Sequence, residues 1–353
     1  MTPLPGRAER NFGVQGPPVK SVMVLAGVSG MVRDAFGDRI LRQAKQAVML
    51  DIEMIEHREC FIPQLVVTDY LWEIERRAKD ANLGLLAAPH LSLANYGRWG
   101  KYVLAADSLG EALARAASSL SYHSTGDSMQ MTLDGHVAKI SFIHATRGRR
   151  GYLHVATGTV AVVLSVLRAY LGAGFLPFRI EIDVPRPPTG TPFEDAFLCP
   201  VVFDAPAVSV CIEAGLLKRA VRAPARPTLI TIEDVARAQA DPLGMGSYLG
   251  VVASYIRSQV EAGVVSIDST ARAMGTSVRT LQRVLRRDNG VDFRELANAV
   301  RLRRAEELLR GTSVSITQIA TDFGYSSPAN FARAFRKACG LAPNEYRQKL
   351  LEK

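Results

Sequence analysis

The chain has 353 residues, of which 48% are hydrophobic and 22% charged, so it can bury the cores of about two domains. This balance excludes a disordered or low-complexity chain. The formal net charge of +9 favours an anionic partner, either a nucleic acid or an anionic membrane surface. Residues 246–353 hold 17 lysines and arginines against 10 acidic residues, so a net charge of +7 lies in the last third of the chain.

The chain shows no signal for a membrane, a secretory route or a metal. The longest early apolar stretch, Val22–Val32, is about half of the ~20 residues that a membrane-spanning helix needs. The four cysteines form no C-x-x-C pair and share no metal-ligand spacing with the six histidines. We therefore expect a cytoplasmic protein with reduced thiols, no metal, no cofactor and no membrane partner.

Residues 1–20, rich in proline, glycine and arginine, are expected to form a flexible tail. Apolar residues at three- and four-residue spacing predict helices over Asp38–Met49, Gln64–Ala81 and Asp107–Leu120, the last with Asp107 as its N-cap. Residues 129–133 and 137–142 then alternate around Asp134-Gly135, which predicts a β-hairpin.

The remaining elements of the first half are a long helix and short strands. They are predicted over Leu153–Leu171, Phe178–Asp183, Val201–Phe203 and Ala207–Ile212. Residues 21–228 are thus expected to form an α+β domain with an antiparallel sheet. Within it, Trp72 and Trp99 are candidates for lining a pocket, although isolated tryptophans more commonly fill a core.

A proline- and arginine-rich stretch, residues 222–227, marks a domain boundary. We expect residues 229–246 to be a linker containing a short helix near Glu233–Ala240. From Ser247 onward the pattern is helical, so residues 247–353 are predicted to form an all-α domain.

The strongest signal is an internal repeat in this last domain. Ala271, Gly275 and Ser277 recur 49 residues later as alanine, glycine and serine, at Ala320, Gly324 and Ser326. Each copy predicts two short helices that cross at the small alanine and are joined by a turn at the glycine. This arrangement is a helix-turn-helix.

In the first copy, Ser277 is expected to cap the second helix. The outer face of that helix carries side chains of the types that contact base edges and phosphates, namely Arg279, Gln282, Arg283 and Arg286.

The second copy begins with a predicted capping box, Ser315 and Gln318, and its second helix begins at Ser327-Pro328. Its outer face carries Ser327, Asn330, Arg333, Arg336 and Lys337. A helix capped by Asp292 and Glu295 joins the copies and spans roughly 25 Å. It could hold two recognition helices about one DNA turn apart, ~34 Å.

These residues resemble the DNA-binding domain of the AraC/XylS family of bacterial regulators. The resemblance covers about residues 247–350. It is carried most specifically by residues between Ile316 and Arg347, namely Ala320, Phe323-Gly-Tyr-Ser326, Phe331, Arg333, Phe335-Arg-Lys337, Gly340, Pro343 and Tyr346-Arg347.

The resemblance implies that both recognition helices enter adjacent major grooves of double-stranded DNA. It places Arg279, Gln282 and Arg283 on bases or phosphates, together with Asn330 and Arg333 from the second copy. Pro328 and Ala329 stand where some members carry polar contacting side chains. We therefore expect the first copy to choose bases and the second mainly to grip the backbone.

The first half resembles the arabinose-binding-like effector domain of one AraC-type branch. This resemblance rests on Ile62-Pro63, Leu71-Trp-Glu73, Leu83-Gly-Leu85, Leu109-Gly-Glu-Ala-Leu113 and Pro200-Val-Val-Phe203. It implies binding of a small-molecule effector and a contribution to a homodimer. The function expected is a sequence-specific transcription regulator, an activator that contacts RNA polymerase.

Two other functions, a DNA-repair enzyme and a non-specific architectural protein, are alternatives for a chain with this DNA-binding domain. AraC-type domains also occur fused to alkylation-repair methyltransferases, which need a cysteine in a Pro-Cys-His-Arg setting. Cys199 is followed by Pro200 instead, so no enzyme is expected. A non-specific architectural protein would show no preferred sequence, and its affinity would fall uniformly as salt rises.

Overall fold

The computed structural model describes residues 16–80, 82–187, 193–220, 230–239 and 247–351. Most of the expected tail, residues 1–15, lies outside these ranges. Its end does not behave as a tail, because Val19 and Lys20 are buried in strand β1 (Val19–Ser21). This strand pairs antiparallel with β2 (Phe61–Pro63) and is held by the polar side chain of Thr125 as well.

The N-terminal domain begins with a layer of helices. They are α1 (Val28–Phe36), α2 (Asp38–Val48), α3 (Ile52–Ile55), α4 (Gln64–Ala78), α5 (Leu83–Ala87), α6 (Gly97–Leu104) and α7 (Leu109–Ser119). The expected N-cap of α7 was wrong by one residue. Ser108 accepts the hydrogen bond from the Glu111 amide, while Asp107 donates its own amide to the Glu111 carboxylate.

A five-stranded sheet follows, in the order β3-β4-β7-β5-β6. Its strands are β3 (Ser128–Asp134), β4 (Val137–Ile143), β5 (Arg179–Glu181), β6 (Val201–Val202) and β7 (Val208–Glu213). The β3–β4 hairpin is confirmed, and its two-residue turn is Gly135-His136.

The sheet is not wholly antiparallel, contrary to expectation, because β5 and β6 pair in parallel. Between these two strands the chain passes through the short helix α9 (Phe193–Phe197). The crossover returns the chain to the edge at which β5 begins, so β6 runs in the same direction.

Helix α8 (Tyr152–Leu171) is the central helix of this domain and packs against β7, α5 and α7. It is long and apolar enough to cross a membrane by length and composition alone, a feature that the sequence reading passed over. However, 61% of its most apolar window is buried inside the protein, which is typical of a core helix. Helix α10 (Ile232–Gln239) confirms the short helix in the linker and buries Val235 against this domain.

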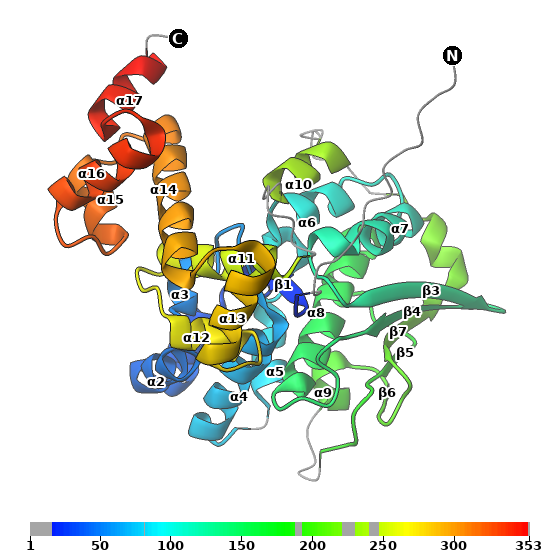
Figure 1. Ribbon diagram of the computed structural model, residues 1–353. Helices are drawn as coiled ribbons and strands as arrows, with labels where there is room; N and C mark the ends of the chain where they lie inside the picture. The colour runs from blue at the N-terminus through cyan, green and yellow to red at the C-terminus, as the bar shows by residue number, and fades with distance from the viewer. Residues whose placement is uncertain (1–15, 81, 188–192, 221–229, 240–246, 352–353) are drawn as a thin grey trace, which may run out of the picture.

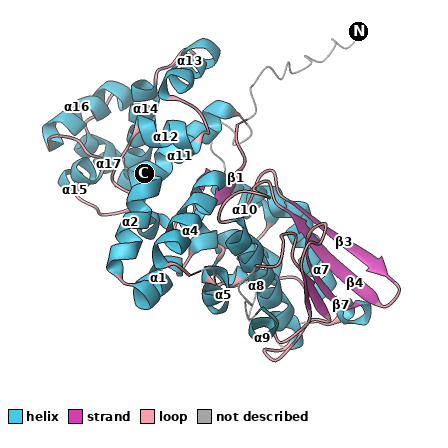
Figure 2. Cartoon of the chain, turned by 90° about the horizontal axis from the view of Figure 1, so that it is seen from below, coloured by secondary structure: helices cyan, strands magenta, loops and turns pink. Residues whose placement is uncertain are grey.

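The described part of the last domain is all helical, as predicted. Its helices are α11 (Tyr248–Glu261), α12 (Ile267–Ala273), α13 (Val278–Asn289), α14 (Phe293–Gly311), α15 (Ile316–Asp322), α16 (Pro328–Cys339) and α17 (Pro343–Leu351). Figure 2 shows these helices gathered at one end of the molecule and the sheet at the other.

The predicted caps are largely confirmed. Ser277 and Ser327 each accept a hydrogen bond from the third residue of their helix, and Asp292 with Glu295 forms a complete capping box. The second predicted box is half formed. Ser315 accepts from the Gln318 amide, but the Gln318 side chain donates to Asp322 instead of returning to Ser315.

Candidate nucleic-acid interface and effector cavity

Each helix-turn-helix unit is built around one glycine. Gly275 and Gly324 have φ of +66° and +71°, a left-handed conformation that other residues adopt at a cost. In the first unit, Ala271, Leu281 and Leu285 are buried between α12 and α13. Burial of these apolar side chains fixes which face of α13 points outward.

The outer face of α13 carries the four residues expected from the sequence. Arg279, Arg283 and Arg286 are exposed and Gln282 is half-buried. Among the described residues, none of these three guanidinium groups forms a hydrogen bond or ion pair. They are therefore free to make bidentate contacts with guanine or phosphate.

The outer face of α16 differs because its polar side chains bond to one another. Asn330 donates to the Ser326 hydroxyl at 2.6 Å, and Arg333 donates to the Asn330 side-chain oxygen. The Ser327 hydroxyl accepts from the Asn330 amide as the helix cap. A bidentate contact between a base and Asn330 or Arg333 would compete with these bonds, whereas the exposed Lys337 has no such competing bond among the described residues.

The second unit is held together by aromatic packing. Phe331 and Phe335 are fully buried, and their ring centroids lie 5.7 Å apart. Tyr346 of α17 packs edge-on against Phe335 and bonds to Arg310 of α14. Both units cap their second helix with a serine. The cap of α13 is Ser277, and the cap of α16 is Ser327, one residue after the serine that matches Ser277 in the sequence repeat.

The first unit rests on the N-terminal domain, while the second extends beyond it at the far end of α14 (Figure 1). Ser254 and Ser258 of α11 both donate to the carbonyl oxygen of Phe61 in β2, at 3.3 and 3.0 Å. Ser269 and Arg272 of α12 donate to the carbonyls of Met49 and Ala47. No hydrogen bond or ion pair joins α15–α17 to residues 16–220 within the described ranges.

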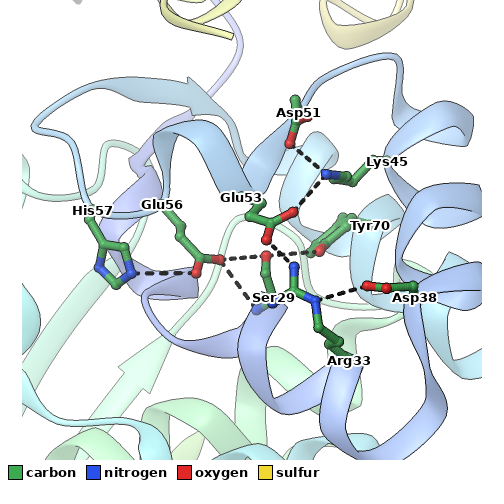
Figure 3. Close-up of polar contacts among 9 residues, drawn as sticks. All are labelled: Ser29, Arg33, Asp38, Lys45, Asp51, Glu53, Glu56, His57 and Tyr70. Carbon is green, nitrogen blue, oxygen red and sulfur yellow. Dashed lines mark hydrogen bonds and ion pairs between the residues drawn. The ribbon is translucent and has the colours of Figure 1, made fainter.

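A polar network stabilises the corner on which α12 rests (Figure 3). Lys45 contacts both Asp51 and Glu53, and Arg33 bridges Glu53 to Asp38. These side chains join the ends of α1, α2 and α3 on either side of the carbonyl-bearing segment 47–49.

Beside this network lies a buried carboxyl group. Burial raises the pKa of Glu56, although the Ser29 hydroxyl, 2.6 Å away, donates to it and favours the charged form. Tyr70 approaches the same Ser29 hydroxyl at 3.4 Å. The contact therefore ties α4, which carries Tyr70, to α1 and the residue after α3.

The N-terminal domain contains a cavity of about 120 Å³ that is partly open to solvent. Along α8, the lining runs from His154 to Val166, which is about 18 Å of helix. Most of the lining is aliphatic, and Trp99 closes one part of it with its ring nitrogen bonded to Ser119 at 2.8 Å. Trp99 thus lines the cavity, whereas Trp72 is not among its lining residues and lies under Arg150.

The cavity has one polar end, formed around Asp127. Lys20 contacts its carboxylate at 2.8 Å, and Ser124 and Gln64 donate hydrogen bonds to it. Burial alone would raise the pKa of Asp127, but the nearby Lys20 ammonium and His144 hold it well below its usual range.

The polar end is directly connected to the DNA-binding domain. Lys20 pairs across the ribbon with Ile62 of β2, and Gln64 follows β2 in sequence. Phe61 of β2 precedes Ile62 and Gln64 in sequence and contacts α11, because its carbonyl oxygen accepts hydrogen bonds from Ser254 and Ser258. The paired strands β1 and β2 therefore contact the cavity through Lys20 and α11 through Phe61.

The outer-face residues of both units and a pocket in the N-terminal domain could be predicted from the sequence, whereas the polar end of the cavity and the contacts between domains could not. Lys20 was assigned to a tail, and Asp127 was not singled out. Strands β1 and β2 have three residues each, all of them buried, so neither shows an alternating pattern of apolar and polar residues. A backbone carbonyl such as that of Phe61 leaves no mark on the sequence.

Two family models match the chain. The arabinose-binding N-terminal domain of the AraC transcription regulator matches residues 21–221, and a helix-turn-helix domain matches residues 270–349. The first match spans more than half of the chain.

Individual relatives agree with these matches. The ornithine utilization regulator of Pseudomonas aeruginosa is 23% identical over 75% of this chain and 78% of its own length. The transcriptional activator RhaS of Escherichia coli is 36% identical over 87 residues, which cover 25% of this chain and 31% of RhaS. The crystal structure of the regulator CdpR from Pseudomonas aeruginosa is 23% identical, with 75% of this chain and 86% of that one covered and a TM-score of 0.34.

The two named sequence relatives are a regulator and a transcriptional activator, as the sequence predicts. The two matched regions also correspond to the α+β and all-α parts of the fold. The chain belongs to the AraC family of DNA-binding transcription regulators and carries an N-terminal ligand-binding domain.

Proposed function

We propose that this chain is a cytoplasmic activator of transcription that binds its operator sequence-specifically, as a homodimer, in response to a small molecule held in the N-terminal cavity. The single observation that carries this proposal is the link from the polar end of the cavity to α11 through Phe61. RhaS, which is named an activator, supports the sign of regulation. An activator at a promoter would contact RNA polymerase.

In this proposal the first unit selects the sequence and the second anchors the protein. The three unpaired arginines of α13 support base contacts by the first unit. The bonds among Ser326, Asn330 and Arg333, together with Pro328 at the tip of α16, support backbone contacts by the second.

The experiment is recovery of bound fragments from a genomic library by the full chain, followed by footprinting. We expect protection of two adjacent major-groove segments on one face of the duplex. Arg283→Ala should relax the preference for the recovered sites, whereas Arg98→Ala, a change of an exposed arginine on α6, should leave it intact. Uniform recovery of all fragments by the wild-type chain would contradict the proposal.

A further inference from the structure

The cavity wall does not suit a sugar. A sugar carries a hydroxyl group on nearly every carbon, and each one buried without a hydrogen-bond partner costs free energy. Along α8 the wall includes Val155, Val162, Val163 and Val166, whose side chains offer no donor or acceptor. The two polar side chains of this stretch, His154 and Thr159, are already hydrogen-bonded within the protein. Met129 and Phe142 of the sheet continue this apolar surface.

The carboxylate at the polar end has its partners already. Asp127 accepts hydrogen bonds from Ser124 at 2.6 Å, from Gln64 at 3.0 Å and from the Ala145 amide at 3.0 Å, besides contacting Lys20. An ammonium group of a ligand would have to displace one of these donors. The arrangement therefore disfavours amino acids and amines.

At the polar end of the cavity, the Lys20 ammonium keeps spare hydrogen-bonding capacity. Its ammonium has three N–H donors, and within the described residues Asp127 is its one recorded partner. The Lys20 and Asp127 charges already cancel, and both side chains are more than nine-tenths buried. A carboxylate added here would bury a net negative charge, whereas a neutral oxygen acceptor would not.

Three histidines line the cavity, and burial lowers the pKa of two of them, His123 and His144, which disfavours their charged forms. The ring of His123 stacks on those of both Tyr96 and Trp99, with ring centroids 4.6 and 4.5 Å away, and these two rings also contact each other. Burial lowers the pKa of His123 to about 3, so its ring is neutral near pH 7. These three rings form an aromatic wall and do not attract an anion.

We propose that the cavity binds an uncharged amphiphile, whose aliphatic body lies along α8 and whose single carbonyl or hydroxyl oxygen accepts a hydrogen bond from Lys20. This inference rests on the proposed function, since it assigns the cavity to the effector. The proposed ligand differs from a sugar, which the name of the matched domain suggests, and from ornithine, which appears in the name of one relative.

The experiment uses the two tryptophans, only one of which lines the cavity. In full-length Trp72→Phe, the remaining emission comes from Trp99. Decanamide, 1-decanol, decanoate, L-arabinose and L-ornithine are titrated separately at pH 7.5. We expect decanamide and decanol to change the emission saturably and to raise the melting temperature. Decanoate should bind roughly tenfold more weakly or worse, and arabinose and ornithine should change neither signal.

A matched pair of variants locates the binding. Val163→Phe places a ring in the cavity and should weaken decanamide binding by about tenfold or more. Val202→Phe makes the same change at an exposed position of β6 and should leave binding unchanged. Ala116→Leu fills the cavity from α7 and provides a second test if Val163→Phe does not fold.

Three results would overturn the proposed ligand class: tighter binding of decanoate than of decanamide, a Trp99 response to arabinose or ornithine, or no response to either neutral probe. Footprinting on the same preparations keeps the two proposals apart. Loss of a neutral-probe response with an intact footprint rejects the ligand class alone. Absence of any sequence-specific footprint rejects the proposed function, whatever the probes do.

Discussion

The two helix-turn-helix units share a topology but differ in their surroundings. The first rests on the N-terminal domain through two side chains of α12 and two of the preceding helix α11, all of which donate to backbone carbonyls. Arg279, Arg283 and Arg286 on its outer helix are unpaired among the described residues. The second extends beyond it, is held by its own aromatic core, and engages its outer polar side chains internally. A repeated pattern therefore predicts repeated structure, while the environment decides what each copy does.

The largest effect is expected from a substitution in the apolar core of the second unit. Phe335 is fully buried between Phe331 and Tyr346, so Phe335→Ala should cost about 3–5 kcal/mol in local stability. Hydrogen exchange of the α16 amides measures this loss. Because α12 and α13 are braced by the N-terminal domain, their protection should change little. Equal loss of protection in α13 would show that the two units unfold together.

A smaller effect on DNA affinity is expected from substitutions on the outer faces of α13 and α16, and it should differ between them. Arg283→Ala should cost about 1–3 kcal/mol on the selected operator and relax base preference, because an exposed and unpaired guanidinium is lost. Arg333→Ala should weaken binding to operator and random duplex about equally. The measurement is a pair of affinities for each variant at one salt concentration. Equal weakening by Arg283→Ala would make that residue a phosphate contact.

Lowering the pH should destabilise the N-terminal domain, on which the first unit rests, before it destabilises the second unit. The pKa of His123 is lowered by burial to about 3, so the unfolded chain takes up a proton first as pH falls below about 6.5. Stability of the N-terminal domain should therefore fall by about 1–2 kcal/mol by pH 5. His123→Phe keeps the ring stack and should flatten this fall in thermal denaturation. An unchanged pH profile in that variant would assign the fall to other groups.

The smallest effect concerns the contact between domains. Ser258 is fully buried and donates to the Phe61 carbonyl, so Ser258→Ala should cost about 1 kcal/mol, since Ser254 still satisfies the same oxygen. The expected readout is faster hydrogen exchange in α11 with unchanged exchange in α15 and α16. Ser313→Ala, a change of an exposed serine between α14 and α15, is the matched control. Faster exchange in both units would contradict independent support.

Features encoded within a few residues could be predicted from the sequence. The glycine turns at Gly275 and Gly324, the serine caps and the outward residues of α13 and α16 all follow local spacing, and the structure contains them. Features made by distant segments could not. The parallel pairing of β5 with β6 depends on where a crossover returns, and the cavity gathers residues from Lys20 to Val166.

The half-formed box at Ser315 shows the same limit on a smaller scale. Ser315 and Gln318 have the right spacing, yet Asp322 lies one turn further along and accepts the Gln318 side chain. Spacing identifies the possible partners of a side chain, but competition among them is settled only in the folded chain.

The central claim is that the first unit selects bases and the second holds the backbone. Selection of binding sites from randomised duplexes by the full chain, Arg283→Ala and Arg333→Ala tests it most directly. For the wild type, we expect one strongly and one weakly preferred major-groove segment. Arg283→Ala should lose the strong preference, and Arg333→Ala should retain it. Retention of the strong preference in Arg283→Ala and its loss in Arg333→Ala would contradict the account.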